Sequence, residues 1–241
     1  MHDRLVTVDL RGVTVVLLPG TGSDDNYVRR AFGPAVARVG AVLHTPAPDP
    51  RRLIASYLQA LDETEGDAPI IVGGVSLGAA VATNWALEHP DRTVGVLAAL
   101  PAWTGAPDGA PAALAAGYSA QQLREIGLDA AVAAMRAGSP DWLGAELARS
   151  WTGQWPALPD AMDGAAGYVG PATAALRELT VPLGLAAAVD DAVHPIDVAR
   201  HWAVTAPRAE LRTVTLQAMG IDAAVLGEAC VGALLDAANH R

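Results

Sequence analysis

Residues 70–82 read "IIVGGVSLGAAVA" and join a β-branched apolar run to an alanine-rich helical run. Gly74 and Gly78 stand on either side of Ser76 and permit a turn that side chains would obstruct. Such a turn lifts the Ser76 hydroxyl above the sheet, at the positive end of the helix dipole. A plain strand-to-helix turn is the alternative. Between a buried strand and a helix, however, Gly-x-Ser-x-Gly predicts a nucleophile elbow, with Ser76 as the nucleophile.

The rest of the chain alternates between short apolar runs and helical stretches. The runs typical of strands are 5–10, 13–18, 41–44, 69–72, 93–99, 181–189 and 211–216. The helical stretches are 26–39, 50–65, 77–88, 196–205 and 223–238. This alternation predicts an α/β fold whose mainly parallel sheet, of about seven or eight strands, is covered by helices on both faces.

One interval breaks the alternation, because 104–178 contains helical patterns and no convincing strand. With 241 residues the chain is long enough for one domain with a sizeable core. We therefore expect a single domain, 1–241, with a helical cap inserted at 104–178.

Composition excludes several functions. The net charge is −10 and all 16 basic residues are arginines, which argues against a nucleic-acid-binding surface. The absence of lysine excludes Schiff-base chemistry and a P-loop. No apolar run approaches the roughly 18 residues of a membrane span, and no signal peptide is evident, so a soluble, cytoplasmic protein without a membrane partner is expected. The single cysteine, Cys230, is expected to be a buried, inert thiol. Composition leaves the oligomeric state open.

A second glycine-containing turn follows the strand at 13–18, in "LPGTGSDD". A plain turn capped by Ser23 or Asp24 would explain it. If Ser76 is an elbow nucleophile, exposed backbone N–H groups of this turn, Thr21 foremost, are expected to face it. With the N–H of Leu77 they would bind a developing oxyanion.

Together the two motifs resemble the α/β-hydrolase superfamily in order and spacing, and the resemblance extends over the whole chain. The family fold implies a serine hydrolase, esterase-like, with a catalytic Ser, His and acid. The resemblance implies that the acid follows the strand at 181–189, usually with a proline four residues later. Asp191 fits, with Pro195 four residues on, and Asp190 is the alternative. Both could also be simple turn formers.

The family's catalytic histidine follows the last strand, directly after the glycine of a Gly-x-Asp turn. This chain has Gly220-Ile221-Asp222 there. The resemblance therefore implies that Ile221 occupies the position of the missing triad histidine, and that activity is impaired, because a serine without a general base is a weak nucleophile.

Three explanations remain open. His194, beside the acid, is a candidate surrogate base, although it could be an ordinary loop residue whose reach to Ser76 is unknown; His44 is a weaker candidate. Alternatively, the protein is a pseudo-hydrolase or a non-hydrolytic ligand-binding protein that retains the pocket. The third explanation is that Ile221 was introduced by engineering.

The insertion indicates the substrate class. Trp103, Trp142 and Trp151 are candidate pocket residues, although tryptophans more often serve packing. A cap with few charges, above acidic Asp24 and Asp25, favours a neutral apolar molecule. The leading prediction is a serine-hydrolase-like protein acting on small, largely apolar esters or related acyl compounds, with no cofactor and no metal.

Overall fold

A six-stranded parallel sheet forms the centre of the computed structural model, which describes residues 9–64 and 68–239. Its strands, in the spatial order β2-β1-β3-β4-β5-β6, are β2 (Val42–His44), β1 (Thr14–Leu18), β3 (Ile70–Val75), β4 (Thr93–Ala99), β5 (Leu183–Ala188) and β6 (Ala209–Val214). The α/β fold is confirmed. The expected count of seven or eight strands is too high for the described residues. Of the strand expected at 5–10, residues 5–8 lie outside the described ranges and residues 9–10 are not in a strand.

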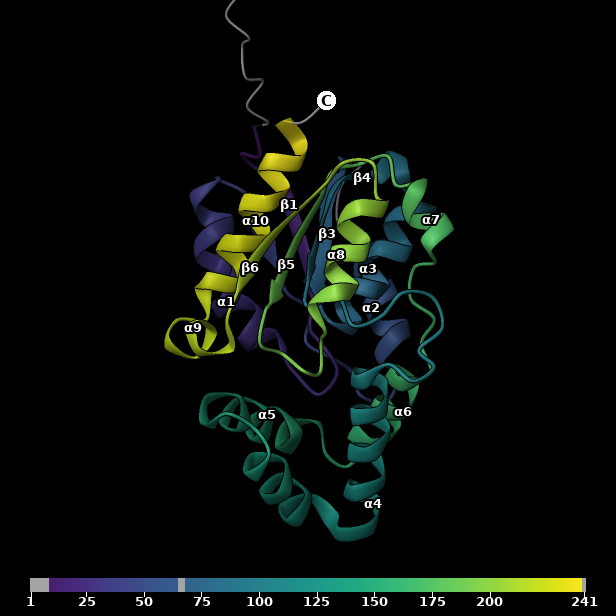
Figure 1. Cartoon of the computed structure of the whole chain (residues 1–241), viewed down its shortest axis with the longest axis vertical. Helices are drawn as coiled ribbons and strands as arrows, with labels where there is room; N and C mark the ends of the chain where they lie inside the picture. Colours follow the sequence, from purple (N-terminus) through teal and green to yellow (C-terminus); the bar gives the residue numbers. More distant parts are fainter. Residues whose placement is uncertain (1–8, 65–67, 240–241) are drawn as a thin grey trace, which may run out of the picture.

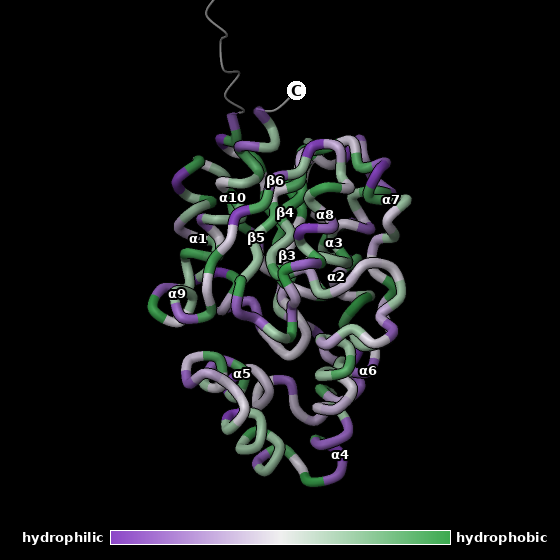
Figure 2. The backbone as a smooth tube through the Cα atoms, in the orientation of Figure 1, coloured by the Kyte–Doolittle hydropathy of each residue, from purple (hydrophilic) through white to green (hydrophobic). Residues whose placement is uncertain are grey.

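Helices cover both faces of the sheet, as Figure 1 shows. One face carries α1 (Asp25–Arg38) and α10 (Ala224–Asn239), and the other carries α2 (Leu53–Asp62), α3 (Leu77–Glu88) and α8 (Ile196–Thr205). The four inner strands, β1, β3, β4 and β5, are apolar along most of their length because helices cover both of their faces, and Figure 2 shows this hydrophobic centre. The edge strands β2 and β6 are partly exposed. Two buried cores result, one on each face. The first is centred on Trp85 and Trp202, and the second on Phe32 and Leu226.

The strand order places a ligand crevice at a defined point. From β1 the chain moves outward to β2 and then returns to the opposite side of β1 as β3, so the direction of winding reverses between β1 and β3. In open parallel sheets, ligands bind at such a reversal, beyond the carboxyl ends of the strands. The loop after β1 and Ser76 after β3 both lie there.

Three helices form a cap beyond this end of the sheet (Figure 1): α4 (Pro111–Ala137), α5 (Asp141–Gln154) and α6 (Leu158–Ala166). Gly127 kinks α4, at φ 77° and ψ 172°. The cap has its own apolar core, in which Leu123 packs with Trp151. The interval also contains α7 (Thr173–Arg177), which packs against α8 of the main domain.

The remaining elements are short: a 3-10 helix, η1 (Pro90–Arg92), and α9 (Leu216–Ile221), which precedes α10. Within the described ranges, no helix combines the length and hydrophobicity required to cross a membrane.

Candidate active site

Ser76 stands at a strained turn between β3 and α3. Its φ of 55° lies in the left-handed region, which residues other than glycine rarely adopt. The glycines around it allow the turn to pack against the end of β1, because a Cβ atom on Gly74 or Gly78 would collide with the carbonyl oxygen of Leu18. The Ser76 N–H is held by the carbonyl of Ala99, at 2.9 Å. The backbone thus fixes the hydroxyl at the carboxyl end of the sheet.

His194 connects Ser76 to Asp191. Its Nε2 lies 2.9 Å from the Ser76 Oγ, and its Nδ1 lies 2.8 Å from the Asp191 Oδ2. With the proton on Nδ1, the imidazole donates to the carboxylate and accepts the serine hydroxyl. A base oriented in this way can take the proton of a hydroxyl as the oxygen attacks a carbonyl carbon.

The loop after β5 carries both Asp191 and His194. Oδ1 of Asp191 accepts the N–H groups of Val193 and His194, at 2.8 and 3.2 Å, which folds the loop back so that the imidazole meets the second carboxylate oxygen. Both side chains are shielded, with exposed fractions of 10% for Asp191 and 17% for His194. Burial alone would raise the pKa of Asp191, but the hydrogen bonds from His194 and from the two backbone N–H groups outweigh it and lower that pKa. The carboxylate therefore remains ionised opposite the imidazole.

Asp190, the alternative acid, has another partner. Its Oδ1 accepts the N–H of Leu216, at 2.8 Å, and so ties the loop after β5 to the start of α9. Of the two neighbouring aspartates, Asp191 is the one that contacts the imidazole.

The structure corrects the expectation for Ile221. Its side chain is 81% exposed, and it is absent from the described residues that line the cavity at Ser76. The segment expected to be a turn is instead the helix α9, in which Met219 is buried; two residues later a helix faces nearly the opposite side, so Ile221 points into solvent. Gly220 has a packing role, because a Cβ there would overlap the Trp142 indole of the cap. The prediction that Ser76 has no base because of Ile221 does not hold for this geometry, in which His194 reaches it.

Replacing Ile221 with histidine should therefore not raise ester hydrolysis. An exposed side chain that contacts none of the reacting groups makes no interaction with the transition state, so its replacement should change kcat/KM by no more than about twofold. Steady-state kinetics on a small neutral ester checks this. A gain of several orders of magnitude would mean that α9 swings its side chain toward Ser76.

The loop 20–24, between β1 and α1, faces the elbow. Gly20 lies against Ser76, since a Cβ on Gly20 would lie 3.4 Å from the Cβ of Ser76, and Thr21 lines the cavity. The Asp24 side chain caps α1 by accepting the Tyr27 N–H, at 3.0 Å, so this loop is also a helix entrance, as the alternative interpretation required. Leu77 opens α3, where backbone N–H groups have no partner within the helix.

A cavity of about 290 Å³ lies between the elbow and the cap. Ser76, Asp191 and His194 line one side. The rest is mainly apolar, and its cap side includes the predicted residues Trp103, Trp142 and Trp151, together with Met135, Leu143, Leu147 and Met162. Among the described residues that line it there is no arginine, and the acidic side chains are Asp191 and Glu146.

The other described histidines lie elsewhere. His44 is exposed on the edge strand β2, His89 stacks on Trp85, and the His201 Nε2 is 2.9 Å from the hydroxyl of Thr173. In the described ranges no three His, Cys, Asp or Glu side chains converge as metal ligands. Cys230 is buried, as predicted, and burial raises the pKa of its thiol.

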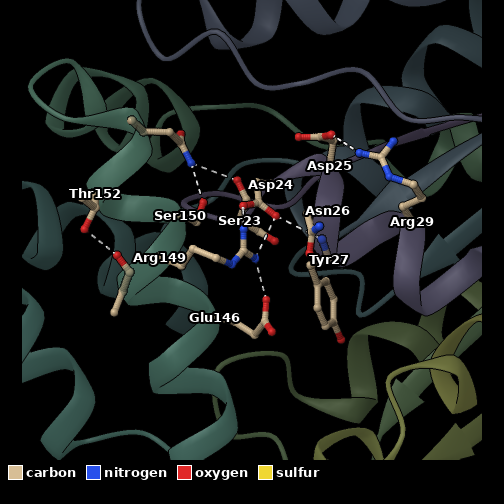
Figure 3. Close-up of polar contacts among 12 residues, drawn as sticks. Ser23, Asp24, Asp25, Asn26, Tyr27, Arg29, Glu146, Arg149, Ser150 and Thr152 are labelled. Atoms are coloured by element: carbon tan, nitrogen blue, oxygen red, sulfur yellow. Dashed lines mark hydrogen bonds and ion pairs between the residues drawn. The ribbon is translucent and has the colours of Figure 1, made fainter.

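Several polar residues of the site, all on α5, were not singled out from the sequence: Gln154, and Glu146, Arg149 and Ser150, which Figure 3 labels. Glu146, Arg149 and Gln154 have partners on the loop 20–24 or on α1, and Ser150 accepts a hydrogen bond from Gln154 on its own helix. The contact between Gln154 and Ser23 joins residues 131 positions apart. The helical pattern of a sequence does not indicate which distant residue a side chain will contact. The sequence signal was limited to two uncharged polar residues, Ser150 and Gln154, four apart on an otherwise amphipathic helix.

These features define an α/β protein with the α/β-hydrolase fold, and comparison with solved structures agrees. A carboxylesterase of the thaumarchaeon Nitrososphaera gargenis superposes with a TM-score of 0.70 at 14% identity, over 88% of this chain and 86% of that one. The enol-lactonase of Burkholderia xenovorans LB400 gives 0.64 at 17%, over 86% and 83%. The thioesterase domain of the curacin biosynthetic pathway gives 0.64 at 14%, over 94% and 92%.

At the sequence level, no protein-family model and no curated protein matches this chain. With identities this low, the structural similarity establishes the fold, and the function has to be argued from the site.

Proposed function

We propose that this protein is a serine hydrolase acting on small, neutral, largely apolar esters or related acyl compounds. One observation carries the proposal: His194 is hydrogen-bonded at once to the Ser76 hydroxyl and to the Asp191 carboxylate, at a cavity large enough for a small substrate. The proposed reaction does not need a histidine at position 221, because His194 is the base and comes from the same loop as the acid, Asp191.

Each residue has a definite role in the proposed reaction. Ser76 Oγ attacks the acyl carbonyl carbon while His194 Nε2 takes its proton, and Asp191 stabilises the resulting imidazolium. The N–H groups of Thr21 and Leu77 receive the oxyanion of the tetrahedral intermediate. The imidazolium then returns the proton to the departing oxygen, leaving Ser76 acylated. Water, deprotonated by His194, releases the acid and restores the serine.

The lining of the cavity supports a neutral substrate. Tryptophan, methionine and leucine side chains offer apolar contact, and no arginine is available in the described lining to pair with a carboxylate. Asp191 adds negative charge, which disfavours an anionic acyl group, whereas the charge of Glu146 is offset by its ion pairs with Arg30 and Arg149. The structural neighbours include a carboxylesterase, an enol-lactonase and a thioesterase, whose reactions are all acyl chemistry, and this favours the same class of reaction for the present chain.

Covalent labelling tests the proposal. A fluorophosphonate should modify Ser76, detected by peptide mass spectrometry, and the same protein should hydrolyse a short-chain p-nitrophenyl ester. Ser76→Ala should lose both. If the folded protein is not labelled and not active, the hydrolase proposal fails and a ligand-binding protein that retains the pocket is favoured. In that case the apolar ester should still bind, without turnover.

A further inference from the structure

The cap helix α5 contacts three consecutive residues of the loop 20–24, namely Gly22, Ser23 and Asp24. Gln154 Nε2 donates to the backbone carbonyl of Ser23, at 2.9 Å, and lies 2.8 Å from the Ser150 hydroxyl. Gln154 and Ser150 are buried, with exposed fractions of 6% and 4%. A buried amide that donates to a loop carbonyl is a specific attachment, because leaving that carbonyl without a partner would be costly.

The middle of the loop packs against the same helix. Gly22 has φ +69°, and a Cβ there would lie only 2.7 Å from the Trp151 Nε1. The Trp151 indole therefore covers Gly22, at which the loop has no side chain. On the other side, the Ser23 N–H closes the turn by donating to the Gly20 carbonyl, at 3.0 Å.

The end of the loop is held by charge. The Arg149 guanidinium pairs with Asp24, and with Glu146 on its own helix at 2.6 Å (Figure 3). Glu146 also pairs with Arg30 of α1, at 2.5 Å. Since Asp24 is the N-cap of α1, this network joins α5 to the exact residue at which the loop becomes a helix.

Thr21 lies between Gly20, whose carbonyl accepts the Ser23 N–H, and Gly22, which the Trp151 indole covers. The loop contains Gly20 and Gly22, whose backbones are free to adopt many conformations, so its own sequence does not fix where the Thr21 N–H points. An oxyanion donor must be held at 2.7–3.1 Å from the developing charge, and a misplacement of about 1 Å can cost on the order of 100-fold in rate.

We propose that Gln154 is a positioning residue: through the Ser23 carbonyl, it sets the direction of the Thr21 N–H, so that the cap completes the oxyanion hole. This inference rests on the proposed hydrolase function. It assigns the cap helix α5 a role in transition-state stabilisation in addition to enclosing the substrate.

The test replaces Gln154 with methionine, which keeps the length of the side chain and removes the donor. For a small ester, kcat should fall about 10-fold to 100-fold, the range of a displaced donor, while KM changes little. The decisive measurement is the affinity for an aryl trifluoromethyl ketone, which forms a tetrahedral oxyanion adduct with Ser76. That affinity should fall by the same factor as kcat. Affinity for the corresponding trifluoromethyl alcohol, which forms no adduct, should not change.

Matched controls separate positioning from general damage to the cap. Thr152→Ala alters the same helix, but among the described residues the Thr152 hydroxyl donates to the Ala148 carbonyl of its own helix, so both affinities and kcat should stay at wild-type values. A second pair keeps the test usable if Gln154→Met does not fold. Arg149→Met should lower ketone affinity several-fold, whereas Arg29→Met, which breaks the exposed ion pair with Asp25 inside α1, should not.

The outcomes are distinguishable. If the wild-type protein forms no ketone adduct in ¹⁹F NMR and hydrolyses no ester, the hydrolase function and the positioning role both fail. If wild type forms the adduct and a folded Gln154→Met binds the ketone equally well, only the positioning role is overturned. An equal loss of affinity for the ketone and the alcohol would also overturn it, because a general change in the pocket would then explain the defect.

Discussion

Replacing His194 with alanine should lower kcat for a small neutral ester by a factor on the order of 10⁶, as the loss of the serine or the histidine does in comparable triads. The reason is geometric, since in the described structure His194 is the imidazole that contacts the Ser76 hydroxyl. Without it the hydroxyl keeps its proton as it attacks. Stopped assays at high enzyme concentration, with the Ser76→Ala protein as the background, measure the residual rate.

His44→Ala is the control for this experiment. His44 was the weaker candidate base, and it is exposed on the edge strand β2, so its removal should leave kcat unchanged. If His194→Ala retained activity within tenfold of wild type, another group would have to be the base. Fluorophosphonate labelling of Ser76 should show the same difference: His194→Ala should be labelled far more slowly than wild type, and His44→Ala at the wild-type rate.

Replacing Asp191 with asparagine should lower kcat on the order of 10⁴-fold, because an amide in this place favours the wrong tautomer of the imidazole and cannot stabilise its charged form. The side chain retains its size and can still accept the backbone N–H groups of Val193 and His194. The defect should therefore appear in kcat, with a circular dichroism spectrum close to that of wild type.

Asp190→Asn is the matched control. Asp190 is adjacent in sequence and accepts the Leu216 N–H, but the imidazole contacts Asp191. Its substitution should change kcat far less. If the two variants were equally impaired, the loss would reflect the fold of the loop after β5 and not the acid.

The same carboxylate gives a dependence of stability on pH. Because the pKa of Asp191 is lower in the folded protein than in the unfolded chain, its ionised form favours folding above the ordinary aspartate value of about 3.9. This contribution is lost as the pH falls through the lowered pKa. Urea titrations of wild type and Asp191→Asn should therefore converge at acid pH.

Local patterns in the sequence were sufficient for most of the fold. Apolar runs bounded by turns identified β4 and β3, and helical periodicity placed α3 and α8 at their observed bounds. The elbow was recognisable because its requirements are local, namely two glycines around one serine between a strand and a helix.

The histidine that contacts Ser76 was harder to predict from the sequence, because its usual position in the family follows from chain order alone. The Gly-x-Asp segment was expected to form a turn facing Ser76, but helix α9 directs Ile221 outward and uses Gly220 to seat Trp142. Whether His194 could reach Ser76, 118 residues away in sequence, depended on how the loop after β5 folds around Asp191.

The sequence by itself determined the alternation of strands and helices, the serine turn, the acidic loop and the helical insertion, because each depends on interactions within a few residues. Only the tertiary structure decided which histidine meets the serine and which cap residues hold the loop 20–24. Those contacts join segments that are distant in the chain, and their geometry is set by the packing of whole elements against one another.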